Sequence, residues 1–179
     1  MGVRIPWTPL MVTFGIFLSG CSTSTTIETK TVVPKSLLLL SSSACVARQG
    51  GQLPDLRCTP GATDPAVTQQ NIHATICVSG YTASVRPPVS VTNALKGSQI
   101  ALYGYADTNP KDYEEDHLIS LELGGAPSDA KNLWPEFGPS PNPKDKVENL
   151  LHKLVCAGKM ALKTAQALIT HDWTAIHFP

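Results

Sequence analysis

The segment 113–158 constrains the fold of this chain more than any other. Its first part alternates loosely between apolar and polar residues and is broken at the glycine pair 124–125, which favours a short hairpin or strand pair. Proline is favoured at the start of a helix and glycine just after its end, so Pro143 and Gly158 mark a helix over 144–157. The segment therefore predicts a small strand pair followed by one helix.

Three more helices are expected outside this segment. Capping residues and apolar spacing predict one over 64–77, another over 93–103 and a last one over 161–176. Residues 81–91 are expected to be extended, because a residue that precedes proline is pushed away from helical geometry. The predicted fold class is therefore α+β, a small and mostly helical domain.

The N-terminal sequence is typical of an exported protein. Residues 1–20 combine a short positive start, a brief apolar run and small residues ahead of Cys21, as in a secretory signal peptide. Leu-Ser-Gly-Cys at 18–21 resembles the bacterial lipoprotein box, in which the cysteine carries the lipid. A thinner apolar run at 37–40 is an alternative export signal, should the true start codon lie further along. We expect a protein of the bacterial cell envelope, lipid-anchored at Cys21 on the periplasmic side or the outer surface.

Residues 21–57 are rich in serine, threonine and short polar stretches and are expected to form a flexible tether. The folded domain is predicted over 58–179, one ordinary domain for a chain of 179 residues.

An even number of cysteines beyond Cys21 favours disulfides in an oxidising compartment. These are Cys45, Cys58, Cys77 and Cys156. Three pairings are open, and the sequence does not choose among them. A zinc knuckle is the rival interpretation, but the spacing lacks a Cys-x-x-Cys pair.

The charge balance limits the class of partner. The chain has 14 basic and 14 acidic residues, whereas proteins that bind nucleic acid through many phosphates carry a basic excess. This argues against a DNA-coating protein, and less against an enzyme that holds one phosphate.

Side chains suited to hydrolysis gather in the strand pair and the helix. A histidine such as His117 suits a general base because its ordinary pKa lies near neutrality, and Asp116 beside it is a candidate metal ligand. Neighbours on a strand point to opposite faces, so both reach one site only if the chain bends. Asn132 is a candidate to fix the His117 tautomer, the alternative being an ordinary turn asparagine. On the helix, Glu148 and His152 share one side.

Three stretches together resemble the HNH endonuclease family, which uses a ββα-metal motif. They are Glu-Asp-His-Leu-Ile-Ser-Leu-Glu-Leu-Gly-Gly at 115–125, Asn-Leu-Trp-Pro at 132–135 and Lys-Asp-Lys-Val-Glu-Asn-Leu-Leu-His at 144–152. The resemblance implies that His117 is the general base, Asp116 a metal ligand and Asn132 the residue that orients His117.

The chain departs from that pattern where a proline-rich insertion at 136–143 delays the helix. We expect Glu148 and His152 to complete the metal site, with Asp145 and Asn149 as substitutes. One divalent ion is implied, and mixed carboxylate and imidazole ligands suit Mg²⁺, Mn²⁺ or Zn²⁺. Candidates for contact with flanking phosphates, unless they are solvated loop lysines, are Lys131, Lys144 and Lys146.

The leading hypothesis is an exported metal-dependent endonuclease that acts on DNA, or also on RNA, with little sequence preference and without a protein partner. A non-catalytic envelope lipoprotein that keeps the fold for binding or structure is the first alternative. A metal hydrolase of a small phosphodiester is the second.

Overall fold

The structure is a computed structural model that describes residues 45–177. The expected signal peptide over 1–20, the lipidation site at Cys21 and the tether as far as residue 44 lie outside the described residues.

The structure has the strand pair and the following helix that the segment 113–158 predicts. β1 (Tyr113–His117) and β2 (Leu133–Phe137) are antiparallel, with Asp116 opposite Trp134. α3 (Lys144–Cys156) follows them and ends just before the left-handed Gly158. Helices with one two-stranded sheet make the described part an α+β fold, as expected.

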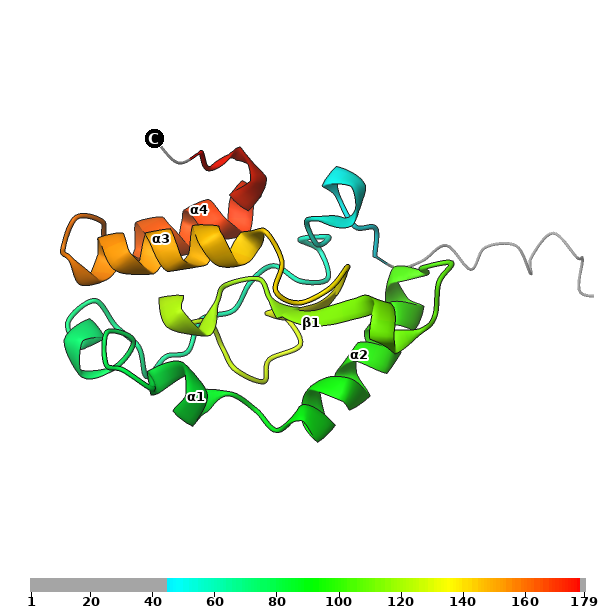
Figure 1. Ribbon diagram of the computed structural model, residues 1–179, viewed down its shortest axis with the longest axis horizontal. Helices are drawn as coiled ribbons and strands as arrows, with labels where there is room; N and C mark the ends of the chain where they lie inside the picture. Colours follow the sequence, from blue (N-terminus) through cyan, green and yellow to red (C-terminus); the bar gives the residue numbers. More distant parts are fainter. Residues whose placement is uncertain (1–44, 178–179) are drawn as a thin grey trace, which may run out of the picture. The chain divides into compact units, whose positions relative to one another are not determined.

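The described residues contain three other α-helices: α1 (Tyr81–Val85), α2 (Val89–Tyr103) and α4 (Leu162–Asp172). α2 includes the helix expected over 93–103 and begins four residues earlier. Figure 1 shows α3 and α4 lying side by side. The extended geometry expected over 81–91 is wrong for most of that segment, because the two prolines at 87–88 only separate α1 from α2. The last helix stops at Asp172, whose carboxylate accepts from Thr174 N and starts a 3-10 turn.

The helix expected over 64–77 is wrong. This segment consists of turns with one 3-10 helix, Ile72–Ala74. Asp64 accepts from Ala66 N, and Asn71 bonds both Thr68 N and the Ala66 carbonyl. Such side chains compete with the helical backbone hydrogen bonds, so the chain turns instead.

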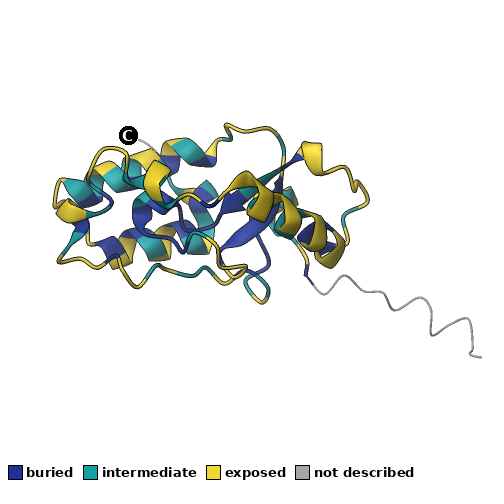
Figure 2. Cartoon of the chain, turned by 90° about the horizontal axis from the view of Figure 1, so that it is seen from below, coloured by how far each residue is buried: buried dark blue, intermediate teal, exposed yellow. Residues whose placement is uncertain are grey.

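The apolar core lies between the loop that joins the strands and the two C-terminal helices. Leu123 from the loop, Leu151 and Val155 from α3 and Ile169 from α4 are all almost fully buried. Figure 2 shows buried residues along the strand pair and on the inward sides of the helices. This core holds α3 against the loop that follows β1.

The tether expected over 21–57 is wrong from residue 45 onward. Cys45 and Leu53 are fully buried, and Cys45 forms a disulfide with Cys58. Asp55 is held by the Arg57 side chain and by Val46 N, which together lower the pKa of its carboxyl. One leucine and one disulfide therefore anchor a segment whose polar composition alone indicates a linker.

Both disulfides that the cysteine count favoured are present, with pairings that the sequence left open. The second joins Cys77 to Cys156 at the end of α3. Two disulfides favour an oxidising, extracytoplasmic location. Within 45–177, no helix is both long and apolar enough to cross a bilayer.

Candidate active site

Asp116 and His117, at the end of β1, line one small cavity together with Glu148 of α3. A regular strand would direct Asp116 and His117 to opposite faces. β1 ends at His117, however, and the chain bends at 118–119, so both residues reach the cavity. The other residues that line it are Arg86, Glu114, Glu115, Ser120, Leu121 and Asp145.

Asn132 stabilises the loop that follows His117. Its side chain is fully buried, accepts from Ile119 N at 2.9 Å, and donates to the carbonyls of Ile119 and Ala126 at 2.9 and 3.1 Å. A glycine at position 125 allows its backbone to pass close to that of Ile119, because a Cβ there would lie 1.7 Å from the Ile119 carbonyl oxygen. Asn132 therefore bonds the backbone of the loop rather than the His117 ring.

The Pro127 carbonyl in the same loop orients His117. It lies 2.9 Å from His117 Nε2, so this nitrogen carries the proton and Nδ1 keeps its lone pair. Burial is the main cause that lowers the pKa of His117. The ring is therefore neutral at pH 7, with Nδ1 able to accept a proton.

The ammonium of Lys144 bridges the two acidic residues of the site. Its Nζ lies 2.8 Å from Asp116 Oδ2, 2.6 Å from Glu148 Oε1 and 2.7 Å from the His117 carbonyl oxygen. Burial lowers the pKa of Lys144, but the charges of Asp116 and Glu148 outweigh it, and the pKa lies above its ordinary value. Trp134 Nε1 donates to Asp116 from the other side, at 3.2 Å.

Lys144 is 1% exposed, so the expectation that it contacts flanking phosphates is wrong. The physical reason is its position in the first turn of α3, which directs it toward the end of β1. Lys131 and Lys146 are exposed but line other pockets, beside α2 and along the outer side of α3.

Carboxylates outnumber cations around the cavity. Burial raises the pKa of Glu115 to about 8, of Glu122 to about 7 and of Glu136 to about 9, and neighbouring carboxylates add to each shift. Both Glu115 oxygens and Glu122 Oε1 are buried without a hydrogen-bond partner among the described residues. The site thus holds protons more tightly than isolated glutamates and attracts added positive charge.

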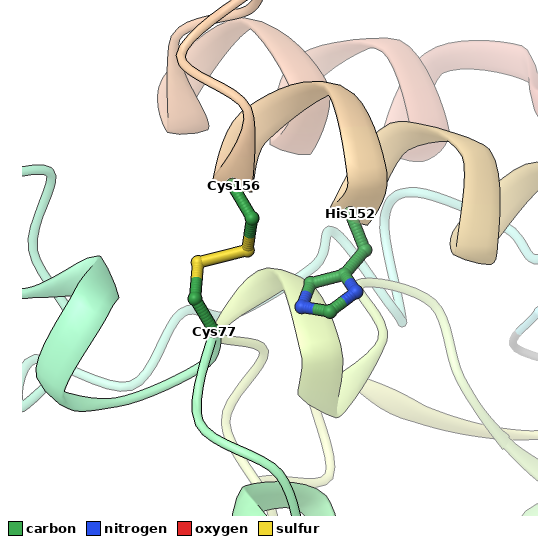
Figure 3. Close-up of side chains that lie close together, drawn as sticks. All are labelled: Cys77, His152 and Cys156. Carbon is green, nitrogen blue, oxygen red and sulfur yellow. A yellow bond between two sulfur atoms is a disulfide. The ribbon is translucent and has the colours of Figure 1, made fainter.

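His152 does not line this cavity, although the sequence predicted it beside Glu148. Its Nε2 lies 2.9 Å from the Ile76 carbonyl oxygen, and its Nδ1 lies 3.7 Å from Glu122. Figure 3 shows the ring beside the Cys77–Cys156 disulfide. The hydrogen bond to Ile76, which is 76 residues away in the sequence, holds the His152 ring outside the cavity that Asp116 lines.

Cys77, His152 and Cys156 place potential ligand atoms within 4.8 Å of one another and could hold a metal ion such as zinc. Their two sulfurs are bonded to each other. Since thiolate is the form of cysteine that binds metals, this group becomes a metal site only after reduction.

Of the substitutes for a helix ligand, Asp145 lines the Asp116 cavity, and Asn149 lines an adjoining one. Sequence reasoning missed four polar or charged lining residues, Arg86, Glu114, Glu115 and Ser120. Three of them are close neighbours of Asp116 and could have been found by proximity. Arg86 lies thirty residues upstream of Asp116, with no sequence pattern to connect the two.

No protein-family model, curated protein or solved structure matches the chain.

Proposed function

We propose that the chain is an HNH-type endonuclease that hydrolyses phosphodiester bonds of DNA or RNA outside the cytoplasm, with a divalent metal ion as cofactor. One observation carries the proposal: Asp116, His117 and Glu148, from a strand pair and the helix that follows it, line one cavity. This order of elements supports the ββα-metal motif that the sequence resembles.

His117 acts as the general base. Its Nε2 donates to the Pro127 carbonyl, so the lone pair of Nδ1 accepts a proton from the attacking water. A lowered pKa keeps the ring unprotonated at neutral pH. Asn132 positions the base indirectly, because it fixes the loop that carries Pro127.

The donor set fits a hard divalent ion. Asp116 and Glu148 supply carboxylate oxygens of the kind that magnesium and manganese prefer. The surplus of buried carboxylates favours further positive charge, and Lys144 already shares oxygens of both residues. A metal bound there would stabilise the negative charge that develops on the phosphate.

The balanced net charge argues against an enzyme that contacts many phosphates, and less against one that holds a single phosphate with a metal. Lipid attachment at Cys21 would keep this activity at the cell envelope, in line with the oxidising location that the disulfides favour.

A second candidate function is binding or structural support without catalysis. Lys144 favours it, because a permanent ammonium between Asp116 and Glu148 stabilises them without a metal.

A nicking assay separates the two. The full chain is incubated with supercoiled plasmid and Mg²⁺ or Mn²⁺, with and without chelator. The endonuclease is expected to nick DNA in a chelator-sensitive manner, and His117→Ala is expected to lose at least about a hundredfold of the rate, the usual contribution of a general base. His171→Ala, at an exposed residue of α4, is the matched control. Chelator-resistant nicking, or an unaffected His117→Ala protein, would refute the proposal.

A further inference from the structure

Arg86 is the accessible cation of two adjoining cavities. The cavity at Asp116 has a volume of about 70 Å³, and its neighbour, of about 200 Å³, shares with it Arg86, Ser120 and Glu148. No lysine lines either cavity within the described residues. Arg86 is exposed and its guanidinium has no ion pair among residues 45–177. Since no ion pair of the described residues involves Arg86, its guanidinium is available for an anion.

The backbone holds Arg86 in place. It directly follows α1, and its N–H donates to the Thr82 carbonyl. The buried Pro87 comes next, before α2 begins. Arg86 and His117 line the same cavity, so the guanidinium lies on the side of the base.

Ser120 supplies a second, independent indication of a ligand. Its side chain is 4% exposed, and its Oγ is buried without a hydrogen-bond partner in the described part of the chain. Buried hydroxyls are almost always hydrogen-bonded, because an unmade bond costs free energy. Since Ser120 lines both cavities that Arg86 lines, a ligand oxygen there would satisfy it.

We infer that Arg86 and Ser120 form the seat for the phosphate of a phosphodiester beside His117, an inference that rests on the proposed function. A guanidinium binds two phosphate oxygens at once through its planar fork, and a hydroxyl donates to one of them.

The charge of the surroundings selects the class of ligand. Four carboxyl groups besides Glu115, which its pKa of about 8 keeps protonated at pH 7, line the same cavity as Arg86: those of Glu114, Asp116, Asp145 and Glu148. Like charges repel, so a dianionic phosphomonoester is disfavoured relative to a phosphodiester, which carries one negative charge. The site therefore takes an internal phosphate of a nucleic acid strand rather than a terminal one.

Binding is measured separately from cleavage. The His117→Ala protein is titrated with a short fluorescent single-stranded oligonucleotide, alone and combined with Arg86→Gln, Arg86→Lys, Ser120→Ala or Lys163→Gln. Lys163 is exposed on α4, so its variant controls for the loss of one charge. Thermal unfolding checks that each variant folds. This is expected, because Arg86 is exposed and the Ser120 hydroxyl has no internal partner.

Arg86→Gln is expected to weaken the Kd about tenfold, as for a charge-assisted bidentate contact. The Kd of Arg86→Lys should lie between the Kd of the protein with Arg86 and that of Arg86→Gln, because lysine keeps the positive charge but lacks the planar fork of the guanidinium. Ser120→Ala should weaken binding about threefold to tenfold. With one phosphate contact to a single strand, the slope of log Kd against log salt should be about 0.7 and should vanish in Arg86→Gln. An Arg86→Gln protein that binds like Lys163→Gln, or no binding by any protein, overturns the inference.

Cleavage by the protein with an intact His117 distinguishes the two proposals. It should release nitrophenolate from bis-p-nitrophenyl phosphate, a diester, and not from p-nitrophenyl phosphate, a monoester; equal rates would overturn the phosphodiester seat. Cleavage that requires His117 but is unchanged in Arg86→Gln refutes the seat alone. Binding that depends on Arg86, without any cleavage, refutes the endonuclease alone.

Discussion

The ammonium of Lys144 lies 2.8 Å from Oδ2 of Asp116, with the lysine side chain 1% exposed. This ion pair joins the first turn of α3 to the end of β1, two elements that carry the candidate catalytic groups. Lys144 also bonds Glu148 and the His117 carbonyl. One buried cation thus sets how the helix sits against the strand pair.

Replacing Lys144 by methionine should destabilise the protein strongly. The variant leaves Asp116 and Glu148 near each other without their cation, and breaking a buried pair from one side costs about 3–5 kcal/mol. Lys146→Met, at an exposed position on the same helix, should change the free energy of unfolding by no more than about 0.5 kcal/mol. Urea unfolding at pH 7 measures both, and equal stability of the two variants would show that the buried pair contributes nothing.

Stability should decline as pH rises from about 5 to 9. Glu115, Glu122 and Glu136 have folded-state pKa values raised to about 8, 7 and 9. The folded protein therefore binds these protons more tightly than the unfolded chain. The resulting stability is fully present below the ordinary pKa of 4.5 and is lost as pH passes through the raised values.

Glu136→Gln tests that decline at one position. Glu136 is 4% exposed and accepts from Asn142. The neutral amide should leave Tm nearly unchanged at pH 5 and raise it, relative to the unmodified protein, at pH 9. Differential scanning calorimetry at the two pH values checks this. An equal change in Tm at both would mean that the carboxyl of Glu136 does not titrate over this range.

Divalent ions should stabilise the protein through Glu148 rather than His152. Binding to the folded state adds about 2.7 kcal/mol at a hundred times the Kd, so Mn²⁺ should raise Tm at pH 8. The shift should disappear in Glu148→Gln and persist in His152→Ala, when both are measured without reductant. The reverse result would place the ion at His152, beside the oxidised Cys77–Cys156 pair, and would contradict a metal site at Glu148.

The two disulfides should contribute unequally to stability. In the chain-entropy account, a bond that spans more residues restricts the unfolded chain more. Cys77 and Cys156 are 79 residues apart, against 13 for Cys45 and Cys58. Replacing both cysteines of the long pair by serine should cost about 4.5 kcal/mol, and of the short pair about 3 kcal/mol. Urea unfolding of the two double variants ranks them, and a larger loss from the short pair would contradict this account.

The sequence by itself determined the strand pair, the helix that follows it and the oxidised cysteines. These depend on short-range preferences: the glycine break at 124–125, the proline before α3 and the count of cysteines. The order of Asp116, His117, Asn132 and Glu148 along the chain also follows from the sequence, and with it the hypothesis of a hydrolase.

Only the tertiary structure decided which of these side chains meet. Lys144 is buried against Asp116, His152 bonds the Ile76 carbonyl, and Arg86 reaches the cavity from a segment thirty residues upstream of Asp116. Residues 45–57 fold because a disulfide and Leu53 anchor them. Such contacts join positions far apart in sequence, and their free energy depends on burial and charge that no local pattern of residues contains.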